Sequence, residues 1–366
     1  MKLDTPREPF LQHLQLAASF CPARSPRPIV QDVLLEVLDG EVVMAATDGE
    51  VSVRTRYRHD GVTGSGRAAL PALTLLSAVR ALSSDGLHIT DSGVLHEISG
   101  GKSLFKLHGD DPELFPSIPG VDLTRAVRVP VAAFVDLCSR TMFAAARDMG
   151  RYAFNGVLLE LDPQEITLVA TDGRRLAMAR MECATGLPER RSSIVPVKGL
   201  IQLQRAATDG GEELSIDLRE NQVAFRLGGS EIVAQLVEGE FPDFRAVLPK
   251  DKDMPRQVEL DREELARAIH RASLTAGDQG RAVELCFDKG LLCVTSRQEG
   301  LGEARSEMGV AYDGDAIGIR FNPEFLGEYL KALEDATVTF RFKDRISAGE
   351  FSSSGNARYV VMPITS

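Results

Sequence analysis

The sequence predicts an α+β protein of three similar domains per chain, each with two helices and antiparallel sheets. This fold class rests on a segment that recurs along the chain. Val33–Gly49 and Val157–Gly173 have equal length and share nine of seventeen residues at an offset of 124 positions. Val283–Arg297 is a weaker third copy at the same spacing. Because 366 residues hold three such repeats, we expect domains at 1–121, 122–248 and 249–366.

An apolar stripe with helical spacing precedes each copy. Its members are Phe10, Leu14 and Ala17 in the first copy, Phe134, Cys138, Thr141 and Ala145 in the second, and Leu265, Ile269, Ala272 and Ala276 in the third. Asp261 is the expected N-cap of the third helix, with Glu264 completing a pattern like a capping box. We expect a second helix after each copy, opening at Pro71, Pro196 or Pro323. Proline is tolerated there because the N–H groups of the first helical turn have no partner within the helix.

Short alternating runs predict the strands that complete each unit. Leu214–Leu218 and Val223–Leu227 flank the polar segment Glu220–Gln222, as the two arms of a hairpin do. The run Val338–Phe342 repeats the alternation in the third copy.

Composition excludes several classes of protein. With 42 Lys and Arg against 53 Asp and Glu, the net charge is −11, which argues against a uniformly basic surface but leaves room for a local basic stripe. No apolar run approaches the roughly 20 residues of a membrane span, and Met1–Phe10 is too charged for a signal peptide. The five cysteines are widely spaced and lack a CxxC pair, so we expect buried thiols in a reducing cytoplasm: Cys21, Cys138, Cys183, Cys286 and Cys293.

Motifs of enzymes are mostly absent, and we predict no catalytic residue, cofactor or metal ligand. Gly100–Ser103 resembles the end of a phosphate-binding loop, but His96 stands where its first glycine is required. His96 has no second histidine at zinc-binding spacing, and no GxSxG elbow occurs. Thr171–Arg175 has two interpretations, an acid–base site or a tight turn that closes a strand; the Asp-Gly pair favours the turn.

Several separated motifs, in order, resemble bacterial DNA polymerase III beta subunits, the sliding clamps. They are Arg151–Leu158 (RYAFNGVL), Val169–Leu176 (VATDGRRL), Gly239–Lys250 (GEFPDFRAVLPK) and Tyr359–Pro363 (YVVMP). Total length and the threefold repeat agree as well, so the resemblance covers the whole chain.

The resemblance implies a non-catalytic ring. Two copies join head to tail, the helices of six domains line a pore around duplex DNA, and the sheets form the rim. Such a ring tethers a polymerase by topology and raises its effective concentration. The six helical windows together carry ten Lys and Arg and nine Asp and Glu, so the bore is roughly neutral within an acidic shell. The window 321–335 is acidic, and some of its acids must face away from the DNA.

Site residues carry over where the motifs match. The implied DNA contacts are Arg24, Arg80, Tyr152 and Lys198. The alternative interpretation of each basic residue among them is an ordinary solvated surface charge. The implied partner-peptide pocket, between the second and third domains, comprises Phe154, Thr171, Gly173, Arg174, Arg175, Leu176, Pro242, Val247, Asn322, Phe325, Ile346, Val360, Met362, Pro363 and Ile364. The family's pocket takes short Gln, Leu and Phe motifs from the DNA polymerase III alpha subunit, the clamp loader, and other polymerases and repair proteins. Without the resemblance, Val360–Pro363 is simply a core strand. Phe105 and Leu274 match the dimer seam.

Departures from the family pattern leave a second hypothesis open. Phe154 stands where a smaller aliphatic residue is common, Ala246 where arginine often sits, and the tail Ile364–Ser366 lacks the leucine on which some members end. The chain is therefore either a replication clamp or a clamp paralogue with altered partner specificity. A cytosolic enzyme on a repeated scaffold is a third class, and it predicts converging titratable groups that the sequence does not reveal.

Overall fold

We describe the protein from a computed structural model. It describes residues 1–91, 94–147, 154–208, 211–277, 282–353 and 356–365. Within these ranges the chain forms three sheets with only antiparallel pairings, and two helices accompany each copy of the repeat, so the predicted α+β fold class is confirmed. The described chain divides into two compact units, one of residues 1–132 and 198–236 and the other of 133–197 and 237–366.

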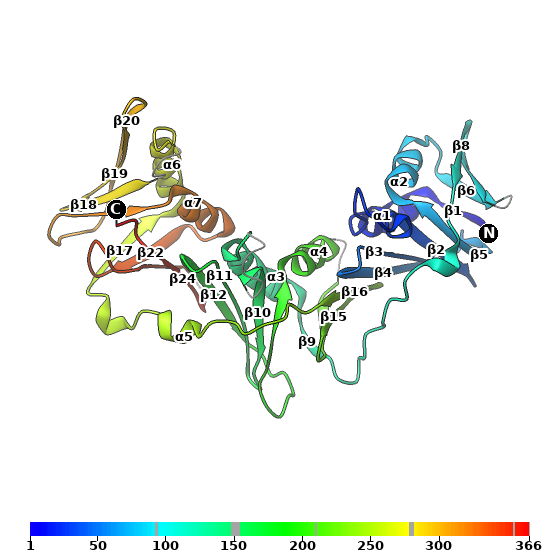
Figure 1. Cartoon of the computed structure of the whole chain (residues 1–366), viewed down its shortest axis with the longest axis horizontal. Helices are drawn as coiled ribbons and strands as arrows, with labels where there is room; N and C mark the ends of the chain where they lie inside the picture. The colour runs from blue at the N-terminus through cyan, green and yellow to red at the C-terminus, as the bar shows by residue number, and fades with distance from the viewer. Residues whose placement is uncertain (92–93, 148–153, 209–210, 278–281, 354–355, 366) are drawn as a thin grey trace. The chain divides into compact units, whose positions relative to one another are not determined.

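The first unit contains one continuous sheet with two helices against it. Its twelve strands, in spatial order, are β8 (Ser103–His108), β7 (Leu95–Gly100), β6 (Gly86–Asp91), β1 (Lys2–Pro6), β5 (Thr63–Pro71), β2 (Asp32–Leu38), β3 (Glu41–Thr47), β4 (Val51–Arg58), β16 (Ser230–Gln235), β15 (Gln222–Leu227), β14 (Glu213–Leu218) and β9 (Val127–Pro130). Helices α1 (Arg7–Ala18) and α2 (Ala72–Ala81) pack side by side, with α1 on β2, β3 and β4 (Figure 1). α4 (Val197–Ala207) also belongs to this unit.

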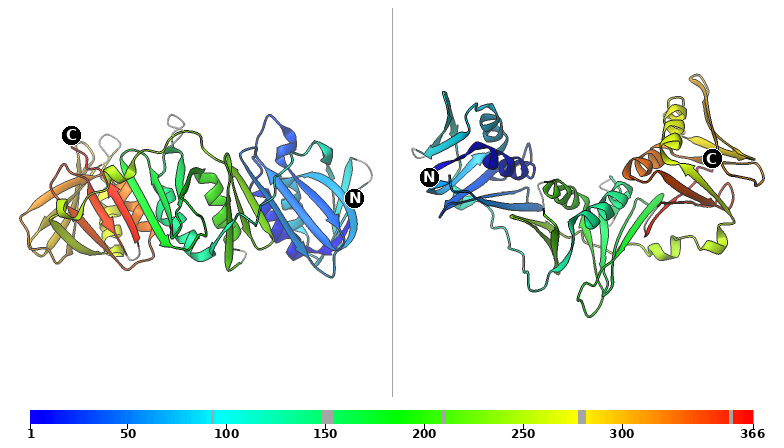
Figure 2. Two further views of the ribbon diagram at one scale, coloured as in Figure 1. Left: turned by 90° about the horizontal axis from the view of Figure 1, so that it is seen from below. Right: turned by 180° about the vertical axis from the view of Figure 1, so that it is seen from behind.

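The second unit contains an eight-stranded and a four-stranded sheet. The larger has the order β13 (Arg191–Pro196), β10 (Gly156–Leu161), β11 (Glu165–Thr171), β12 (Arg175–Glu182), β24 (Asn356–Val361), β23 (Gly349–Ser352), β22 (Thr337–Phe342) and β17 (Arg256–Asp261); the smaller has the order β20 (Gly302–Gly309), β19 (Leu291–Gln298), β18 (Val283–Asp288) and β21 (Ile317–Phe321). Helices α6 (Arg262–Ser273) and α7 (Pro323–Ala332) pack against each other (Figure 2). α3 (Val131–Thr141) and the short α5 (Phe244–Val247) complete the α-helices of the described chain.

The repeat found in the sequence is a repeat in space. Leu34 lies opposite Ala45 in the β2–β3 hairpin, and Leu158 lies opposite Val169 in the β10–β11 hairpin, at the same offset of 124. The predicted hairpin of β14 and β15 forms as well, with Ile216 opposite Phe225. In the third copy, Phe340 stacks on Phe351 with ring centroids 4.3 Å apart inside a buried aromatic core.

The predicted helices occur, with differences at their ends. Phe10, Leu14 and Ala17 are buried on α1, and the Asp261 side chain accepts the Glu264 N–H at 2.7 Å as the N-cap of α6. Pro71 and Pro196 stand directly before α2 and α4, and Pro323 is the first residue of α7. Ala145 and Ala276, which we predicted to continue the apolar stripes, lie beyond helices α3 and α6. These two helices end at Thr141 and Ser273.

The cysteines are less buried than expected. All five are free thiols, but only Cys138 and Cys293 are buried, and the other three are half-buried. Cys286 lies directly opposite Cys293 in the β18–β19 pair. No group of three or more metal-ligating side chains occurs in the part of the chain that the structure describes.

One buried acid makes stability depend on pH. Asp32, at the start of β2, is buried, and its Oδ2 atom has no hydrogen-bond partner within the described residues. Burial, and then the nearby charge of Asp110, raise the pKa of Asp32 to about 7. Between the ordinary carboxyl pKa and this value the folded protein holds a proton that the unfolded chain has lost. The free energy of unfolding therefore falls as the pH rises through that window.

We expect Asp32→Asn to raise the free energy of unfolding at pH 8 by about 1–3 kcal/mol, because a neutral amide removes the cost of a buried charge. Below pH 4 the gain should disappear. Chemical denaturation across pH 4 to 8 measures this, with Asp60→Asn at an exposed turn as the matched control. If the free energy of unfolding of Asp32→Asn falls with pH as steeply as that of the wild type, Asp32 is not the cause of the pH dependence.

Candidate functional site

The segment Thr171–Arg175 forms a tight turn between β11 and β12. The Asp172 carboxylate accepts the backbone N–H of Arg174 at 2.9 Å and of Arg175 at 3.0 Å, and the Thr171 hydroxyl donates to the Arg175 carbonyl at 2.6 Å. Gly173 has a φ of 86°, a conformation that glycine adopts without strain. The turn favoured from spacing alone is thus confirmed, and its own hydrogen bonds fix its shape.

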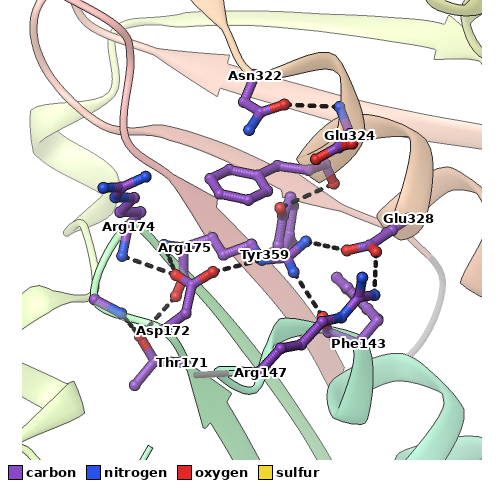
Figure 3. A network of polar contacts seen from close by, with 12 residues as sticks. Phe143, Arg147, Thr171, Asp172, Arg174, Arg175, Asn322, Glu324, Glu328 and Tyr359 are labelled. Carbon is purple, nitrogen blue, oxygen red and sulfur yellow. Dashed lines mark hydrogen bonds and ion pairs between the residues drawn. The ribbon is translucent and has the colours of Figure 1, made fainter. Parts of the chain in front are cut away.

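The Arg175 side chain ties this turn to α7. Its Nε pairs with Asp172 Oδ2 at 3.0 Å, its Nη1 pairs with Glu328 Oε2 at 2.6 Å, and its Nη2 donates to the Phe143 carbonyl at 2.8 Å (Figure 3). The guanidinium carbon lies 4.3 Å from the centroid of the Phe325 ring. Burial disfavours the charge, but the surrounding groups outweigh it and raise the pKa of Arg175. Arg175 is a buried, fully engaged cation that positions the turn.

A polar cavity of about 640 Å³ opens between the turn and α7. Arg147, Arg174 and Arg175 line it from the side of the turn, and Glu324, Phe325 and Glu328 line it from α7. Arg147 also pairs with Glu328, which therefore bridges two arginines. Aromatic, cationic and anionic groups thus meet at this cavity, as in sites that bind short peptides.

An apolar cluster lies on the other face of the same strands. Leu176 of β12 is directly opposite Val360 of β24, and both are buried. With them pack Leu158, Val169, Met178, Ile194 and Phe244, covered in part by Val237, Phe241, Leu248 and Ala348. The segments around this cluster carry exposed large apolar side chains, Val247, Met362 and Ile346. We call these three residues, with the buried pair Leu176 and Val360, the apolar groove.

Most residues of the implied peptide pocket thus belong to two features on opposite faces of the β12–β24 pair. Gly173, Arg174, Arg175 and Phe325 line the polar cavity, Thr171 holds the turn beside it, and the groove residues lie on the other face. Pro242 lies two residues before α5, and Phe154 is half-buried. Asn322 caps α7 by accepting the Glu324 N–H at 2.9 Å, and the Ile364 N–H donates to the Arg320 carbonyl at 2.8 Å beyond Pro363.

Sequence reasoning missed three residues of this site. Glu328 and Phe143 hold Arg175 from α7 and from the segment after α3, and Phe244 packs into the apolar cluster. The signal for Glu328 was its place in an acidic helix, where some acids had to face away from DNA. Glu328 pairs with Arg175, and Asp335 pairs with Arg140 at 3.1 Å, which accounts for two of them.

Of the four implied DNA contacts, Arg24, Arg80 and Lys198 lie on helices or beside them. Arg24 and Arg80 are exposed, after α1 and in the last turn of α2, and neither has an ion-pair partner within the described ranges. Lys198, in the first turn of α4, pairs with Asp48, and burial lowers the pKa of Lys198. Tyr152 and Ser366 lie outside the described residues.

None of the helices in the described ranges is long and apolar enough to cross a membrane.

A chain of repeated α+β units, with a polar cavity on one face of a strand pair and exposed apolar side chains around the other, defines a repeated-domain protein. Family models for the DNA polymerase III beta subunit match in order along the chain: the N-terminal domain at residues 1–119, the central domain at 128–243 and the C-terminal domain at 245–365. The chain belongs to the DNA polymerase III beta subunit family, the beta sliding clamps.

Known relatives match over the full length. The beta sliding clamp of Escherichia coli K12 is 30% identical, with 100% of both chains covered, and that of Chlamydia pneumoniae is 29% identical, with 100% of this chain and 99% of the relative covered. The crystal structure of the Pseudomonas aeruginosa DNA polymerase III subunit beta has a TM-score of 0.91 at 29% identity over 100% of both chains. A P. aeruginosa sliding clamp bound to griselimycin has a TM-score of 0.94 at 29% identity, again over 100% of both chains.

We expect Glu328→Gln to lower the free energy of unfolding by about 1–3 kcal/mol, because it leaves the buried Arg175 without one of its charged partners. Glu324→Gln, an exposed change on the same helix, is the control. Denaturant titration of both variants measures the difference, and equal losses in the two contradict the positioning role of Glu328.

Proposed function

We propose that this chain forms a homodimeric ring around duplex DNA and acts there as a non-catalytic processivity factor in the cytoplasm. Its domains are 1–121, 122–248 and 249–366. The observation that carries the proposal is a pair of unpaired edge strands, β8 and β20, in a chain composed of clamp domains. We infer that β8 of one copy pairs with β20 of the other.

The two edges suit each other chemically. β8 is the last strand of the twelve-stranded sheet and β20 the last of the four-stranded sheet, so each has backbone groups available to a second chain. β8 exposes Lys106 and His108, whereas β20 exposes Glu303, Glu307 and Arg305, the last paired with Glu307. The excess of acids on β20 over its one arginine suits the basic side chains of β8 across paired strands.

Two apolar residues support the same seam. Leu274 is exposed just after α6, which packs on β20 and holds it through Arg271 and the Ser306 hydroxyl at 2.7 Å. Phe105 is half-buried on β8. A contact between Phe105 and Leu274 of two copies removes both from water, as a head-to-tail interface requires.

The charge pattern suits a bore that holds DNA weakly. Arg24 and Arg80 are exposed near helix ends, and we propose that they, Lys198 and Tyr152 face the DNA phosphates. The acids Glu328 and Asp335 are neutralised by arginines, so the acidic window 321–335 carries less free negative charge than its sequence suggests. Weak, salt-sensitive contacts allow sliding.

The apolar groove and the polar cavity are the proposed docking site for partner proteins. We propose that they bind short Gln, Leu and Phe motifs of the DNA polymerase III alpha subunit, the clamp loader, and other polymerases and repair proteins. Leucine and aromatic anchors fit an apolar floor, and a glutamine fits a cavity lined by charged groups. The alternative, a paralogue with altered partner specificity, predicts weak binding of such motifs and is supported by Phe154 and Ala246.

Retention on DNA tests the ring. We expect the protein, after incubation with a clamp loader and nicked circular DNA, to stay on the circle and to leave when the circle is cut. Leu274→Asp should weaken the dimer by about 2 kcal/mol, or some 30-fold, and abolish retention. Sedimentation measures the dimer directly.

The control is Leu38→Asp, an exposed apolar residue on β2 away from both edges. Retention that survives linearisation means ordinary binding and contradicts the ring. No retention, with a loader that is active on a known clamp, favours the paralogue.

Binding of a labelled Gln/Leu/Phe peptide tests the groove. We expect Met362→Glu to weaken binding at least about tenfold, because a charge then replaces an apolar wall. Fluorescence anisotropy measures the affinity, and Ile201→Glu, an equally exposed apolar position on α4, is the control. Equal affinity of the two variants contradicts the docking site.

A further inference from the structure

An arginine-lined cavity of about 440 Å³ adjoins the apolar groove on the outer face of the eight-stranded sheet. Four arginines line it: Arg180, Arg245, Arg341 and Arg358. Glu165 and Glu350 are the acids of its lining, and Met178, Phe244 and Leu248 are apolar walls.

Strand register makes the cavity a continuation of the groove. The groove pair Leu176 and Val360 is followed, two residues along each strand, by the directly opposed pair Met178 and Arg358. Since side chains alternate between faces, both pairs lie on one face of the sheet. Phe244 belongs to the apolar cluster and also lines the cavity.

The carboxylates lie beneath the arginines. Glu350 is fully buried, with an exposure of 0%, and pairs with both Arg341 and Arg358. Glu160, also buried, holds Arg245 through its Oε2 at 2.6 Å.

The guanidiniums at the mouth are more exposed than their partners. The Arg180 side chain is 46% exposed and that of Arg245 is 51% exposed. A ligand therefore meets guanidinium groups that carboxylates already hold in place, the buried Glu160 for Arg245 and the half-buried Glu165 for Arg180, and pre-ordered arginines lose little freedom on binding.

Donors remain for a further anion. Within the described residues Arg180 has one ion-pair partner, Glu165 at 3.3 Å, and the Arg341 Nε, which is buried, has no hydrogen-bond acceptor. Burial, and then the positive charge of Arg245, lower the pKa of Arg190 next to this site. A neighbouring positive charge lowers the pKa of an arginine because it disfavours the charged form. Because each of the four arginines already has at least one carboxylate partner, and Arg341 has two, the site suits one or two added carboxylates better than a polyanion.

We propose that this cavity binds an acidic side chain that flanks the apolar motif of the partner segment seated in the groove. The inference rests on the proposed docking function. It adds a charge-selective subsite, in which Arg180 and Arg245 select partners whose motif is followed or preceded by Asp or Glu. A guanidinium binds such a carboxylate through two parallel hydrogen bonds.

A double-mutant cycle tests the proposal in the full-length protein. Five labelled peptides share one Gln/Leu/Phe core: the core alone, the core with two Glu residues before it or after it, and the same two extensions with Gln. We expect one Glu extension to bind about 5–10-fold tighter than its Gln counterpart at low salt. In Arg180→Gln and in Arg245→Gln this preference should fall below about twofold while the core peptide binds as before.

Arg58→Gln, an exposed arginine paired with Glu41 on the first sheet, is the matched control and should keep the preference. Arg180→Lys keeps the charge and should keep part of it, which separates a charge effect from a folding defect. If the core binds but neither Glu extension adds affinity, the subsite is wrong and the groove stands. If the core fails to bind, the docking function is wrong. If short duplex DNA displaces the Glu peptide but not the core, the cavity is a nucleic-acid site and the proposal is overturned.

Discussion

The pairing of β12 with β24 is the constraint on which the site depends. These strands lie far apart in sequence, yet Arg175 to Arg180 pair in register with Val361 to Asn356. Because side chains alternate, one strand places Arg175 towards α7 and Leu176 towards the outer face. The polar cavity, the apolar groove and the arginine-lined cavity all follow from this one register. A slip by one residue would send Arg175 into the apolar cluster and Leu176 into a network of charges.

The repeat builds this junction twice, but only one copy exposes an apolar groove. β4 pairs with β16 as β12 pairs with β24, and the Gln235 N–H donates to Glu50 as the Met362 N–H donates to Arg174. A cluster of Leu34, Ala45, Ile118, Ala224 and Val233 takes the place of the second cluster. Where the second junction has exposed Met362, the first has exposed Gln235, and buried Val51 stands in place of Arg175. The repeat therefore forms the same strand pairing twice, and a few side chains decide which of the two junctions is suited to a partner.

Local patterns predicted much of the fold, and long-range contacts set the rest. The hairpin of β2 and β3, the apolar face of α1 and the Asp261 cap depend on neighbours within a few residues, so the sequence reveals them. The bridge from Glu328 to Arg175 spans 153 residues and has no periodic signal. The arginine-lined cavity needs five strands in register, β11, β12, β22, β23 and β24, which come from before and after the third copy of the repeat. The implied pocket residues were found by resemblance, and their division between two faces required the strand pairing.

Net charge alone is a poor guide to what such a chain binds. At −11 the protein looks unsuited to DNA, yet several of its acids are partners of arginines. Glu328, Glu350 and Asp335 each pair with at least one arginine. Glu328 and Glu350 each pair with two. Where arginines are paired, the carboxylates fix their geometry; Arg24 and Arg80, which have no ion pair within the described ranges, are exposed to solvent. The placement of the acids, more than their number, therefore decides where this negatively charged chain can attract an anion.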